Sequence, residues 1–479
     1  MPPPHDNRKN GYDAIVIGAG PNGLAAAIEI ARAGRSVCLY EGHSTVGGGT
    51  RSAELTLPGF IHDVCSAIHP LGAASPFFSQ LPLQQYGLEF IFPTSALAHP
   101  FDDGTALIVD RSLDVTAERL GRDGASYRRV FSPLVEKWDS LAPDVLAPIG
   151  MPRHPFAMAG FGLKAIRSAK GFAKAKFQND KTRALFAGMA AHSFLSLDQA
   201  GTTAFGLVLG VLAHAAGWPV VRGGSQGLAN ALAAHLEELG GVIVINHRVE
   251  SLTELPPSRA VLCDVTPRQL VRLAGDSLTN GFRRRLERYR YGPAAFKMDW
   301  ALNAPVPWTA AEARTAATVH IGGSFAEILT SEWKSSHGQH SEKPFIIAAQ
   351  QSLFDSTRAP AGQHTLWAYC HVPNGSTVDM SDAIERQIER FAPGFRDCIL
   401  ARSVMTPADY ERYNPNLVGG DINGGIQDLA QMFLRPTMRL YSTSKDGLYL
   451  CSSSTPPGGG VHGLCGFNAA RVALRKNLR

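Results

Sequence analysis

A glycine-rich turn close to the start of the chain limits what this sequence can fold into more than any other feature. The apolar run at residues 14–17 predicts a buried parallel strand, and residues from Leu24 onward predict an Ala-rich helix. The glycines between them have G-x-G-x-x-G spacing, which allows a tight bend, a close approach of a pyrophosphate to the backbone, and close packing of helix on strand. Phosphates would meet free N–H groups and the positive end of the helix dipole. The predicted phosphate-binding residues are Gly18, Gly20, Pro21, Asn22 and Gly23.

A second strand and an acidic residue follow this helix. Residues 36–40 are mostly apolar and end at Glu41, about 20 residues past the first glycine, where a dinucleotide-binding domain places its ribose-binding acid. The Glu41 carboxylate would accept hydrogen bonds from ribose hydroxyls and would repel a 2′-phosphate, which disfavours NADP. A glycine-rich turn beside a solvated glutamate is the alternative interpretation. Strand, helix, strand and acid together favour a Rossmann-type dinucleotide-binding domain.

Composition narrows the class of protein. The 479 residues suffice for two or three domains, and 44% hydrophobic with 18% charged residues is typical of a soluble chain. A net charge of +5 is too small to indicate nucleic-acid binding, and no nucleic acid is expected as a partner. Seven cysteines without C-x-x-C pairs favour a reducing compartment, and no metal site is expected. Residues 1–10 predict a short disordered lead without a signal peptide, and no run approaches the ~18 apolar residues of a membrane span. We therefore expect a cytoplasmic protein, free or peripheral on a membrane.

A second glycine cluster follows the second strand and carries a family resemblance. It comprises Gly47, Gly48, Gly49, Thr50 and Arg51. An acid followed by a Gly-Gly pair, here Glu41 and residues 47–48, resembles the FAD-dependent phytoene-desaturase and amine-oxidase family, and residues 58–63 resemble the family's next segment. Many members place Arg directly after the pair, whereas this chain has Gly49 there and Arg51 two positions later. The resemblance implies that the cluster contacts FAD, and it leaves open whether Arg51 makes the usual arginine contact.

The C-terminal end carries the second specific motif. A strand at residues 447–451, a Ser- and Gly-rich loop, and a helix from Leu464 predict another anion site at a helix N-terminus. This order closely resembles the family's C-terminal FAD motif, which implies N–H groups near Gly463 facing the N1–C2=O edge of the flavin. Cys465 stands where the family usually has Pro, and we expect it to serve packing. The FAD contacts implied here are Ser454, Gly460, Val461, Gly463 and Leu464.

The middle of the chain alternates between two kinds of segment. Strands that belong again to the dinucleotide domain are predicted at residues 241–245, 248–252 and 260–264. In the family, the residue at the position of Val249 holds the adenine through its backbone, so the resemblance implies the same role for Val249. The predicted fold is α/β: a Rossmann-type FAD-binding domain with an inserted α+β substrate domain of mixed sheet plus helices. The FAD-binding parts are expected at 1–74, 219–275 and 408–479, and the substrate parts at 75–218 and 276–407.

Two segments allow a second interpretation. Residues 151–178 interleave Lys and Arg with Phe, Leu and Ile and contain no acid, which favours either a helix lying on a lipid surface or an ordinary surface helix with a core-facing stripe. Residues 223–227 fit the G-x-S-x-G of a serine hydrolase, but Pro219 interrupts the strand that this motif requires. Ser225 is instead expected to cap the following helix.

Within the family the chain is most similar to phytoene-dehydrogenase-related oxidoreductases, including the pyridine nucleotide-disulphide oxidoreductase domain-containing protein 2 type. The resemblance spans nearly the whole chain and implies non-covalent FAD and a substrate cavity at the flavin face. An aromatic-rich substrate domain favours a desaturase or saturase that acts on an apolar, lipid-like or isoprenoid molecule. The sequence leaves open whether oxygen or a quinone is the electron acceptor. Alternatives are a flavin amine oxidase and a non-catalytic FAD-containing interaction protein on a membrane. No catalytic residue stands out, and hydride transfer to a flavin is expected to need no acid–base group.

Overall fold

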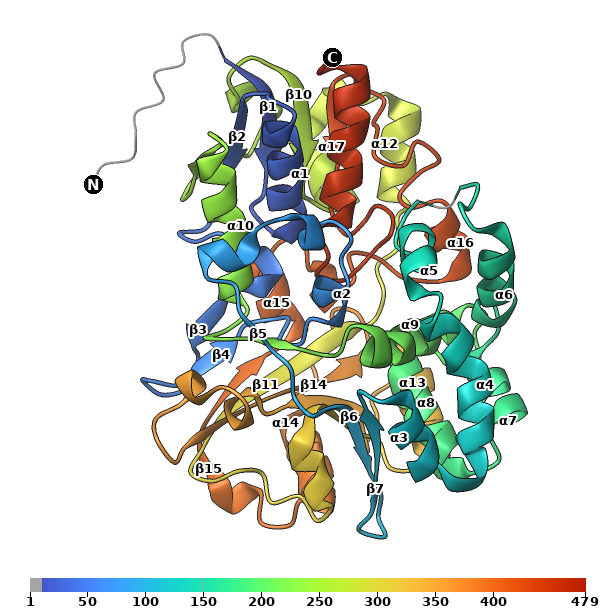
Figure 1. Ribbon diagram of the computed structural model, residues 1–479. Helices are drawn as coiled ribbons and strands as arrows, with labels where there is room; N and C mark the ends of the chain where they lie inside the picture. The colour runs from blue at the N-terminus through green and yellow to red at the C-terminus, as the bar shows by residue number, and fades with distance from the viewer. Residues whose placement is uncertain (1–10, 149) are drawn as a thin grey trace.

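The fold is built on two sheets that are seen one above the other in Figure 1. The computed structural model describes residues 11–148 and 150–479, so the predicted lead at residues 1–10 lies outside the described residues. The upper part of the view holds the N-terminal strands with α1 and α17, the lower part holds the second sheet, and a layer of helices covers one side. The expected class, an α/β fold with a mixed sheet and helices beside a Rossmann-type unit, is confirmed.

The first sheet is entirely parallel, with strand order β16-β10-β1-β2-β9. Its strands are β1 (Tyr12–Ile17), β2 (Val37–Tyr40), β9 (Val242–Val244), β10 (Ser258–Cys263) and β16 (Leu448–Leu450). They come from the beginning, the middle and the end of the chain, as the apolar runs predicted. Residues 248–252, expected as a further strand, form no strand, so Val249 lies in the connection after β9.

Three helices cover one face of this sheet: α1 (Pro21–Arg32), α10 (Gln226–Glu238) and α17 (Leu464–Lys476). Small residues let α1 and α17 lie against each other (Figure 1). A Cβ added at Gly466 would lie 1.7 Å from the carbonyl oxygen of Asn22, so only glycine allows this approach. Likewise, a Cβ at Gly23 would lie 1.8 Å from the carbonyl oxygen of Gly18, which explains the third glycine of the turn.

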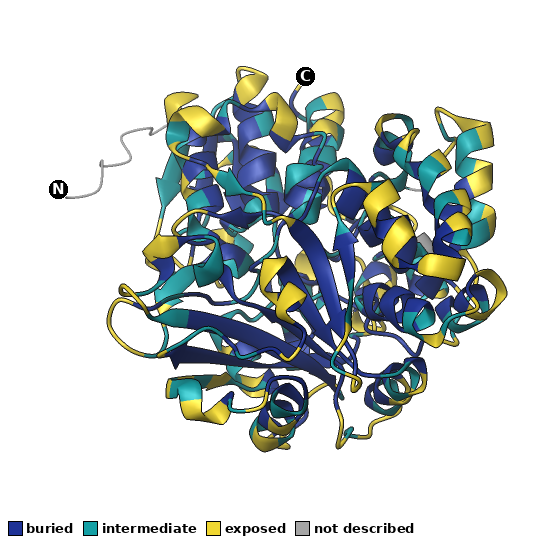
Figure 2. Cartoon of the chain, turned by 60° about the horizontal axis from the view of Figure 1, so that its bottom comes forward, coloured by how far each residue is buried: buried dark blue, intermediate teal, exposed yellow. Residues whose placement is uncertain are grey.

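The second sheet is mixed, with order β15-β11-β14-β13-β12-β6-β7 and one parallel pair, β6 with β12. Its strands are β6 (Ser95–Pro100), β7 (Ala106–Asp110), β11 (Ala294–Leu302), β12 (Ala316–Ile321), β13 (Ile346–Ala349), β14 (His364–Val372) and β15 (Ile399–Met405). The strands at its centre are dark in Figure 2 because both of their faces are covered. Two short ribbons accompany the sheets: β3 (Ser52–Glu54) with β4 (Ile61–Asp63), and β5 (Phe90–Ile91) with β8 (Val220–Val221).

A helical layer flanks the second sheet on the right of Figure 1. It contains α3 (Leu113–Arg119), α4 (Gly124–Val135), α5 (Trp138–Val145), α6 (Pro155–Ala165), α7 (Ala169–Lys176), α8 (Asp180–Ala191), α9 (Thr202–Ala215) and α13 (Phe325–Ser336). Further helices are α2 (Pro70–Ala73), α11 (Pro267–Ala274), α12 (Asn280–Glu287), α14 (Ser381–Phe391), α15 (Pro407–Tyr413) and α16 (Leu429–Phe433). Within the described ranges, every helix is too short or too polar to cross a membrane.

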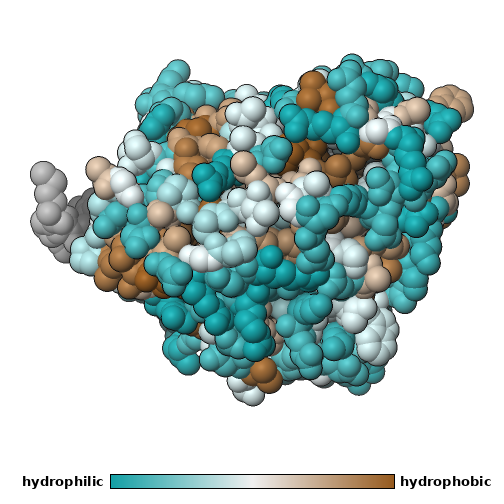
Figure 3. All heavy atoms as spheres, turned by 90° about the horizontal axis from the view of Figure 1, so that it is seen from below, coloured by the Kyte–Doolittle hydropathy of each residue, from teal (hydrophilic) through white to brown (hydrophobic). Residues whose placement is uncertain are grey.

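The basic and aromatic segment at residues 151–178 divides into α6 and α7, and the two helices behave differently. On α7 the apolar stripe is core: Phe172 is fully buried, and Phe177 just past its end is 1% exposed. On α6 Phe161 is buried, whereas Phe156 and Leu163 remain at the surface, 94% and 72% exposed. Seen from below, the surface is mostly hydrophilic with separate apolar patches, including some at the edge formed by the helical layer (Figure 3).

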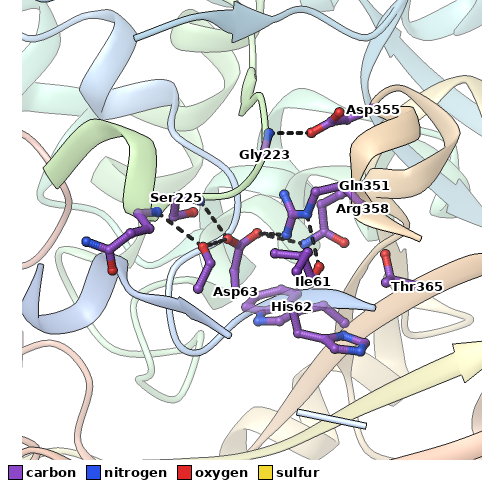
Figure 4. A network of polar contacts seen from close by, with 12 residues as sticks. Ile61, His62, Asp63, Gly223, Ser225, Gln351, Asp355, Arg358 and Thr365 are labelled. Carbon is purple, nitrogen blue, oxygen red and sulfur yellow. Dashed lines mark hydrogen bonds and ion pairs between the residues drawn. The ribbon is translucent and has the colours of Figure 1, made fainter. Parts of the chain in front are cut away.

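A buried polar network ties the β3–β4 ribbon to the rest of the chain (Figure 4). Asp63 is fully buried and accepts hydrogen bonds from Ser52 Oγ at 2.7 Å and from the Ser225 N–H at 2.7 Å. Its other oxygen accepts from Arg358 Nη2 at 2.7 Å and from Gln351 Nε2 at 3.3 Å. The network therefore joins segments that are far apart in the sequence.

The same network corrects the role expected for Ser225. Its side chain does not cap α10; its Oγ donates to the Ser66 carbonyl at 2.7 Å instead. His69 Nε2 lies 2.8 Å from this Oγ, and since the hydroxyl proton is already used, His69 donates to the serine rather than accepting from it. Ser225 is fully buried, so this arrangement is structural and does not form a nucleophile.

Candidate functional site

A cavity of about 540 Å³ opens at the carboxyl ends of β1, β2 and β10, where open parallel sheets bind their ligands. These strand ends and the C-terminal loop line one end of the cavity. The other end comes from β12, β13 and β14 of the second sheet and from the helical layer. The cavity is therefore continuous between the predicted dinucleotide site and the predicted substrate part.

Most of the predicted cofactor-binding residues lie on this wall. The wall includes Gly18, Gly20, Pro21, Asn22, Glu41, Gly48, Gly49, Thr50, Arg51, Val249, Ser454, Gly460 and Val461. Gly23, Gly47, Gly463 and Leu464 are not among its lining residues. Gly23 and Gly47 support the wall without lining it: the Gly23 N–H donates to Asp264 Oδ2, and the Gly47 N–H donates to the Ala19 carbonyl. The structure thus brings the two terminal motifs to one cavity, and individual cofactor contacts stay predictions.

The glycine turn forms a narrow cradle. A Cβ at Gly20 would lie 2.8 Å from Oδ2 of Asp264, and one at Gly48 would lie 3.0 Å from Cα of Gly20. Two backbone segments therefore approach each other at distances that any side chain would block. Gly20 is also the N-cap of α1, so N–H groups at the start of this helix are directed toward the cavity. This cradle fits a diphosphate.

Asp264 at the end of β10 is a site residue that the sequence did not indicate. It lines the cavity, and its Oδ2 accepts the Gly23 N–H at 3.0 Å. Burial raises the pKa of Asp264 to about 7; the Gly23 hydrogen bond opposes this rise and the negative charge of Glu41 adds to it. A carboxyl that holds its proton near neutral pH avoids repelling a diphosphate placed beside it.

The Glu41 side chain lines the cavity, and backbone N–H groups hold its carboxylate in place. Its Oε2 accepts the Ala19 N–H at 2.9 Å, and its Oε1 accepts the His43 N–H at 2.9 Å. Arg51 Nη2 lies 3.2 Å from Oε1 and also donates to the Thr45 carbonyl at 2.7 Å. Arg51 therefore reaches the cavity wall beside the acid although Gly49 takes the position directly after the glycine pair.

The C-terminal loop differs from its expected arrangement at two points, Leu464 and Gly463. Ser454 and Val461 line the cavity, and Ser454 Oγ donates to the Gly424 carbonyl at 2.7 Å. The Leu464 N–H, expected to face a ligand, donates instead to Nδ1 of His462 at 3.0 Å. Gly463 packs inward, because a Cβ there would lie 2.6 Å from the ring of Phe78.

Cys465 follows in α17 and is fully buried. Its Sγ lies 3.4 Å from the carbonyl oxygens of both Thr455 and Gly458, and burial raises the pKa of its thiol to about 12. Cys465 is not a lining residue of the cavity, so it holds the loop rather than reacting with a ligand.

A buried ionic group lies on β11 in the second sheet. Lys297 Nζ donates to Asp299 Oδ2, and both side chains are almost completely enclosed. Burial raises the pKa of Asp299 to about 6, although Lys297 opposes the rise, and burial lowers the pKa of the neighbouring His62 to about 3. The His62 Nδ1 and Asp299 Oδ1 atoms are 3.6 Å apart. None of the three is a lining residue, and no motif in the sequence groups them.

The far end of the cavity is apolar and aromatic. Its wall there includes Leu209, Trp218, Ile347, Trp367, Tyr369 and His192. The rings of Trp367 and Tyr369 meet edge to face at 5.1 Å between centroids. The carboxylates among the described lining residues, Glu41, Glu250 and Asp264, belong to the dinucleotide end. A ligand at the far end therefore meets aromatic surface without a negative partner for a cationic group.

Comparison with known proteins agrees with this geometry. Residues 16–81 match the NAD(P)-binding Rossmann-like domain family. That match, the relatives below and the site define the class of protein: the chain is an oxidoreductase with a Rossmann-type domain that binds FAD.

Two relatives and one solved structure agree with this class. The chain is 27% identical to the pyridine nucleotide-disulfide oxidoreductase domain-containing protein 2 of Mus musculus, over 98% of this chain and 94% of the relative. It is 26% identical to the phytoene desaturase (neurosporene-forming) of Rhodobacter capsulatus, over 95% of this chain and 92% of that one. A solved structure of putrescine oxidase bound to putrescine has the same fold, with a TM-score of 0.62, 15% identity and coverage of 97% and 99%. The resemblance inferred from the two terminal motifs is confirmed.

Proposed function

We propose that this FAD-dependent oxidoreductase transfers hydride between flavin and an apolar, lipid-like or isoprenoid substrate, as a desaturase or a saturase. The observation that carries the proposal is the single cavity that runs from the glycine cradle to the aromatic wall of β14. FAD bound in this cavity would supply the hydride-accepting centre. The near full-length relation to a phytoene desaturase supports the same substrate class.

The chain's own residues have three tasks in this proposal. The cradle at Gly20 and Gly48 and the acid Glu41 hold the dinucleotide. Trp367, Tyr369 and Leu209 exclude water and align an apolar chain, because each presents hydrophobic surface to the cavity. Reaction specificity would then come from the position of the substrate and the exclusion of water at the aromatic end, rather than from an ion pair with the substrate.

Amine oxidation is the second candidate, since putrescine oxidase shares the fold. A diamine substrate needs a carboxylate or another negative partner for its distal ammonium group. The aromatic end of the cavity offers none among its described lining residues, which favours the apolar substrate.

Anaerobic reduction of bound FAD separates the candidates. We expect phytoene or another isoprenoid in detergent to bleach the flavin absorbance, and putrescine to leave it unchanged. Reduction by putrescine alone would support amine oxidation, and a protein that binds FAD but is reduced by neither class would support the non-catalytic alternative. Reoxidation of the substrate-reduced protein by oxygen or by a soluble quinone then identifies the electron acceptor.

We also propose that α6 makes a peripheral contact with anionic membranes. Phe156 and Leu163 are exposed on a helix flanked by Arg153 and Arg167, and such a surface can insert apolar side chains while its basic groups meet lipid phosphates. Co-sedimentation with anionic liposomes should be reduced by Phe156→Glu and Leu163→Glu. Phe92→Glu is the matched control, because Phe92 is 52% exposed outside this segment. Equal sedimentation of all variants, or equal binding to neutral liposomes, would contradict the proposal.

A further inference from the structure

Two histidine rings meet at the aromatic end of the cavity. His192 follows the last residue of α8 and lines the cavity, whereas His320 is fully buried in β12. Their Nε2 atoms are 3.1 Å apart, which is hydrogen-bond distance. When both rings are neutral, a hydrogen bond at this place needs one proton between the two nitrogens, so one ring donates and the other accepts.

The two remaining ring nitrogens are in different surroundings. Nδ1 of His320 is buried without a hydrogen-bond partner among the described residues, and it packs against Gly188, where a Cβ would lie 2.7 Å away. His192 is only partly buried, and its Nδ1 makes no hydrogen bond within the described part of the chain. In the arrangement in which His192 donates through Nε2 to His320, its Nδ1 carries a free electron pair on a ring that lines the cavity.

The proposed reaction needs such a group. When two adjacent C–H groups become a C=C bond, one carbon loses hydride to the flavin and the other loses a proton. The proton needs an acceptor in the wall, and saturation needs the same group as a donor. Among the other ionisable lining residues, burial raises the pKa of the phenols of Tyr369 and Tyr410, so both stay protonated and do not accept.

Resting on the proposed function, we propose that His192 Nδ1 accepts the proton released by the substrate carbon and that His320 is the positioning residue. The electron pair on Nδ1 forms the new N–H bond, the C–H electron pair becomes the π bond, and the hydride leaves to flavin. His192 then becomes a cation that donates through Nε2 to His320. This assigns an acid–base group where the sequence led us to expect none.

The surroundings of the pair keep His192 uncharged. Burial, reinforced by the positive charge of His371, lowers the pKa of His192 to about 3, and burial with the charges of His192, His99 and His371 lowers that of His320. His192 is therefore neutral at physiological pH and has its electron pair available. It also returns the proton readily after turnover. His371 is itself 2.6 Å from Glu332, a buried carboxylate that limits the effect of any positive charge there.

The tautomer of His192 is the direct test, and it needs no substrate. In the FAD-loaded protein labelled with ¹⁵N-histidine, difference spectra against His192→Gln assign the two ring nitrogens. We expect Nε2 to be protonated and Nδ1 not. A protonated Nδ1 in the neutral ring would overturn the proposal, because no electron pair would then face the cavity.

Variants of His320 test its positioning role. His320→Phe removes the acceptor for the His192 N–H and should move the proton of His192 to Nδ1. His320→Gln keeps an acceptor oxygen and should restore the original tautomer. An unchanged tautomer in His320→Phe would refute the role given to His320.

Turnover supplies the second measurement. With phytoene as the probe, His192→Gln should reduce the rate of anaerobic flavin reduction by roughly 10²–10⁴-fold, the range typical of a lost acid–base group. His214→Gln is the matched control, since His214 is a buried histidine of α9 that bonds Tyr127 and does not line the cavity. A wild-type rate in His192→Gln would overturn the proposal. If the wild-type protein is reduced by no isoprenoid, the proposed function fails, whereas the tautomer still decides the assignment of His192.

Discussion

Replacement of Arg358 by Met should destabilise the protein strongly, because it leaves Asp63 charged and enclosed. The two side chains are 1% and 0% exposed, and Nη2 lies 2.7 Å from Oδ2. Removing one partner of a buried ion pair typically costs roughly 3–5 kcal/mol. The hydrogen bonds from Ser52, Ser225 and Gln351 would remain and lower the loss, whereas the Arg358 Nε bond to the Ile61 carbonyl would also disappear. We therefore expect a loss of about 4 kcal/mol in the free energy of unfolding near neutral pH.

The loss should depend on pH in a defined direction. In the wild-type chain burial would raise the pKa of Asp63, but the charge of Arg358 together with the hydrogen bonds outweighs it, so the pKa lies below the ordinary value. A depressed folded-state pKa stabilises the protein above the unfolded pKa, and this contribution is lost as the pH falls through the folded pKa. Without Arg358 the burial effect dominates and the Asp63 carboxyl takes up a proton at higher pH. The destabilisation by Arg358→Met should therefore shrink as the solution is acidified.

Denaturant unfolding of the FAD-loaded proteins, followed at several pH values, measures both effects. Asp63→Asn combined with Arg358→Met should lose less than the sum of the single variants, because it leaves no buried charge. Arg128→Met is the matched control: Arg128 pairs with Asp114 at 2.7 Å, but the side chains are 40% and 74% exposed. We expect that control to change stability by less than about 1 kcal/mol. An Arg358→Met loss as small as the control's, or one that is independent of pH, would refute the reasoning.

Two further predictions concern the cofactor cavity. Gly20→Val should abolish FAD binding, because even a Cβ at this position would lie 2.8 Å from Asp264. The purified variant should be colourless and gain no flavin absorbance when excess FAD is added. Binding at wild-type affinity would show that the cradle is not part of the FAD site. Burial raises the pKa of Asp264 to about 7, so the stability of the apoprotein should fall as the pH rises from the ordinary carboxyl pKa toward 7 and level off above it. FAD titrations should show binding that weakens above about pH 7, where the carboxylate of the apoprotein is charged. Asp264→Asn should remove both trends, and a variant that keeps them would show that another group titrates.

The parts of the fold that the sequence predicted are those determined by local patterns. The apolar runs at β1, β10 and β16 need a parallel sheet covered on both faces, and the glycine spacing after β1 needs a helix packed directly on it. The apolar residues of α14 recur at the spacing that is typical of an amphipathic helix. Residues 248–252 show the limit of such patterns, because a short alternating run forms a strand only where a neighbouring strand is available to pair with it.

Other features depend on contacts between distant segments. Phe156 on α6 and Phe172 on α7 belong to one basic and aromatic segment, yet only Phe172 is covered by neighbouring helices. The wall residues Glu41, Arg51 and Ser454 followed from motifs, whereas Asp264 belongs to the site because β10 pairs with β1 and ends beside the glycine turn.

The histidine pair shows most clearly why a catalytic group can escape sequence analysis. His192 follows the apolar last turns of a helix, and His320 stands in a strand, so neither position differs in pattern from an ordinary buried histidine. Their meeting requires α8 to pack beside β12, a contact that excludes any Cβ at Gly188 and so explains a glycine inside that helix. A proton acceptor in an apolar cavity has to be uncharged when the substrate enters, and burial of the ring together with a second imidazole provides that condition. The group that would remove the proton is therefore defined by the packing of two elements rather than by any motif within either one.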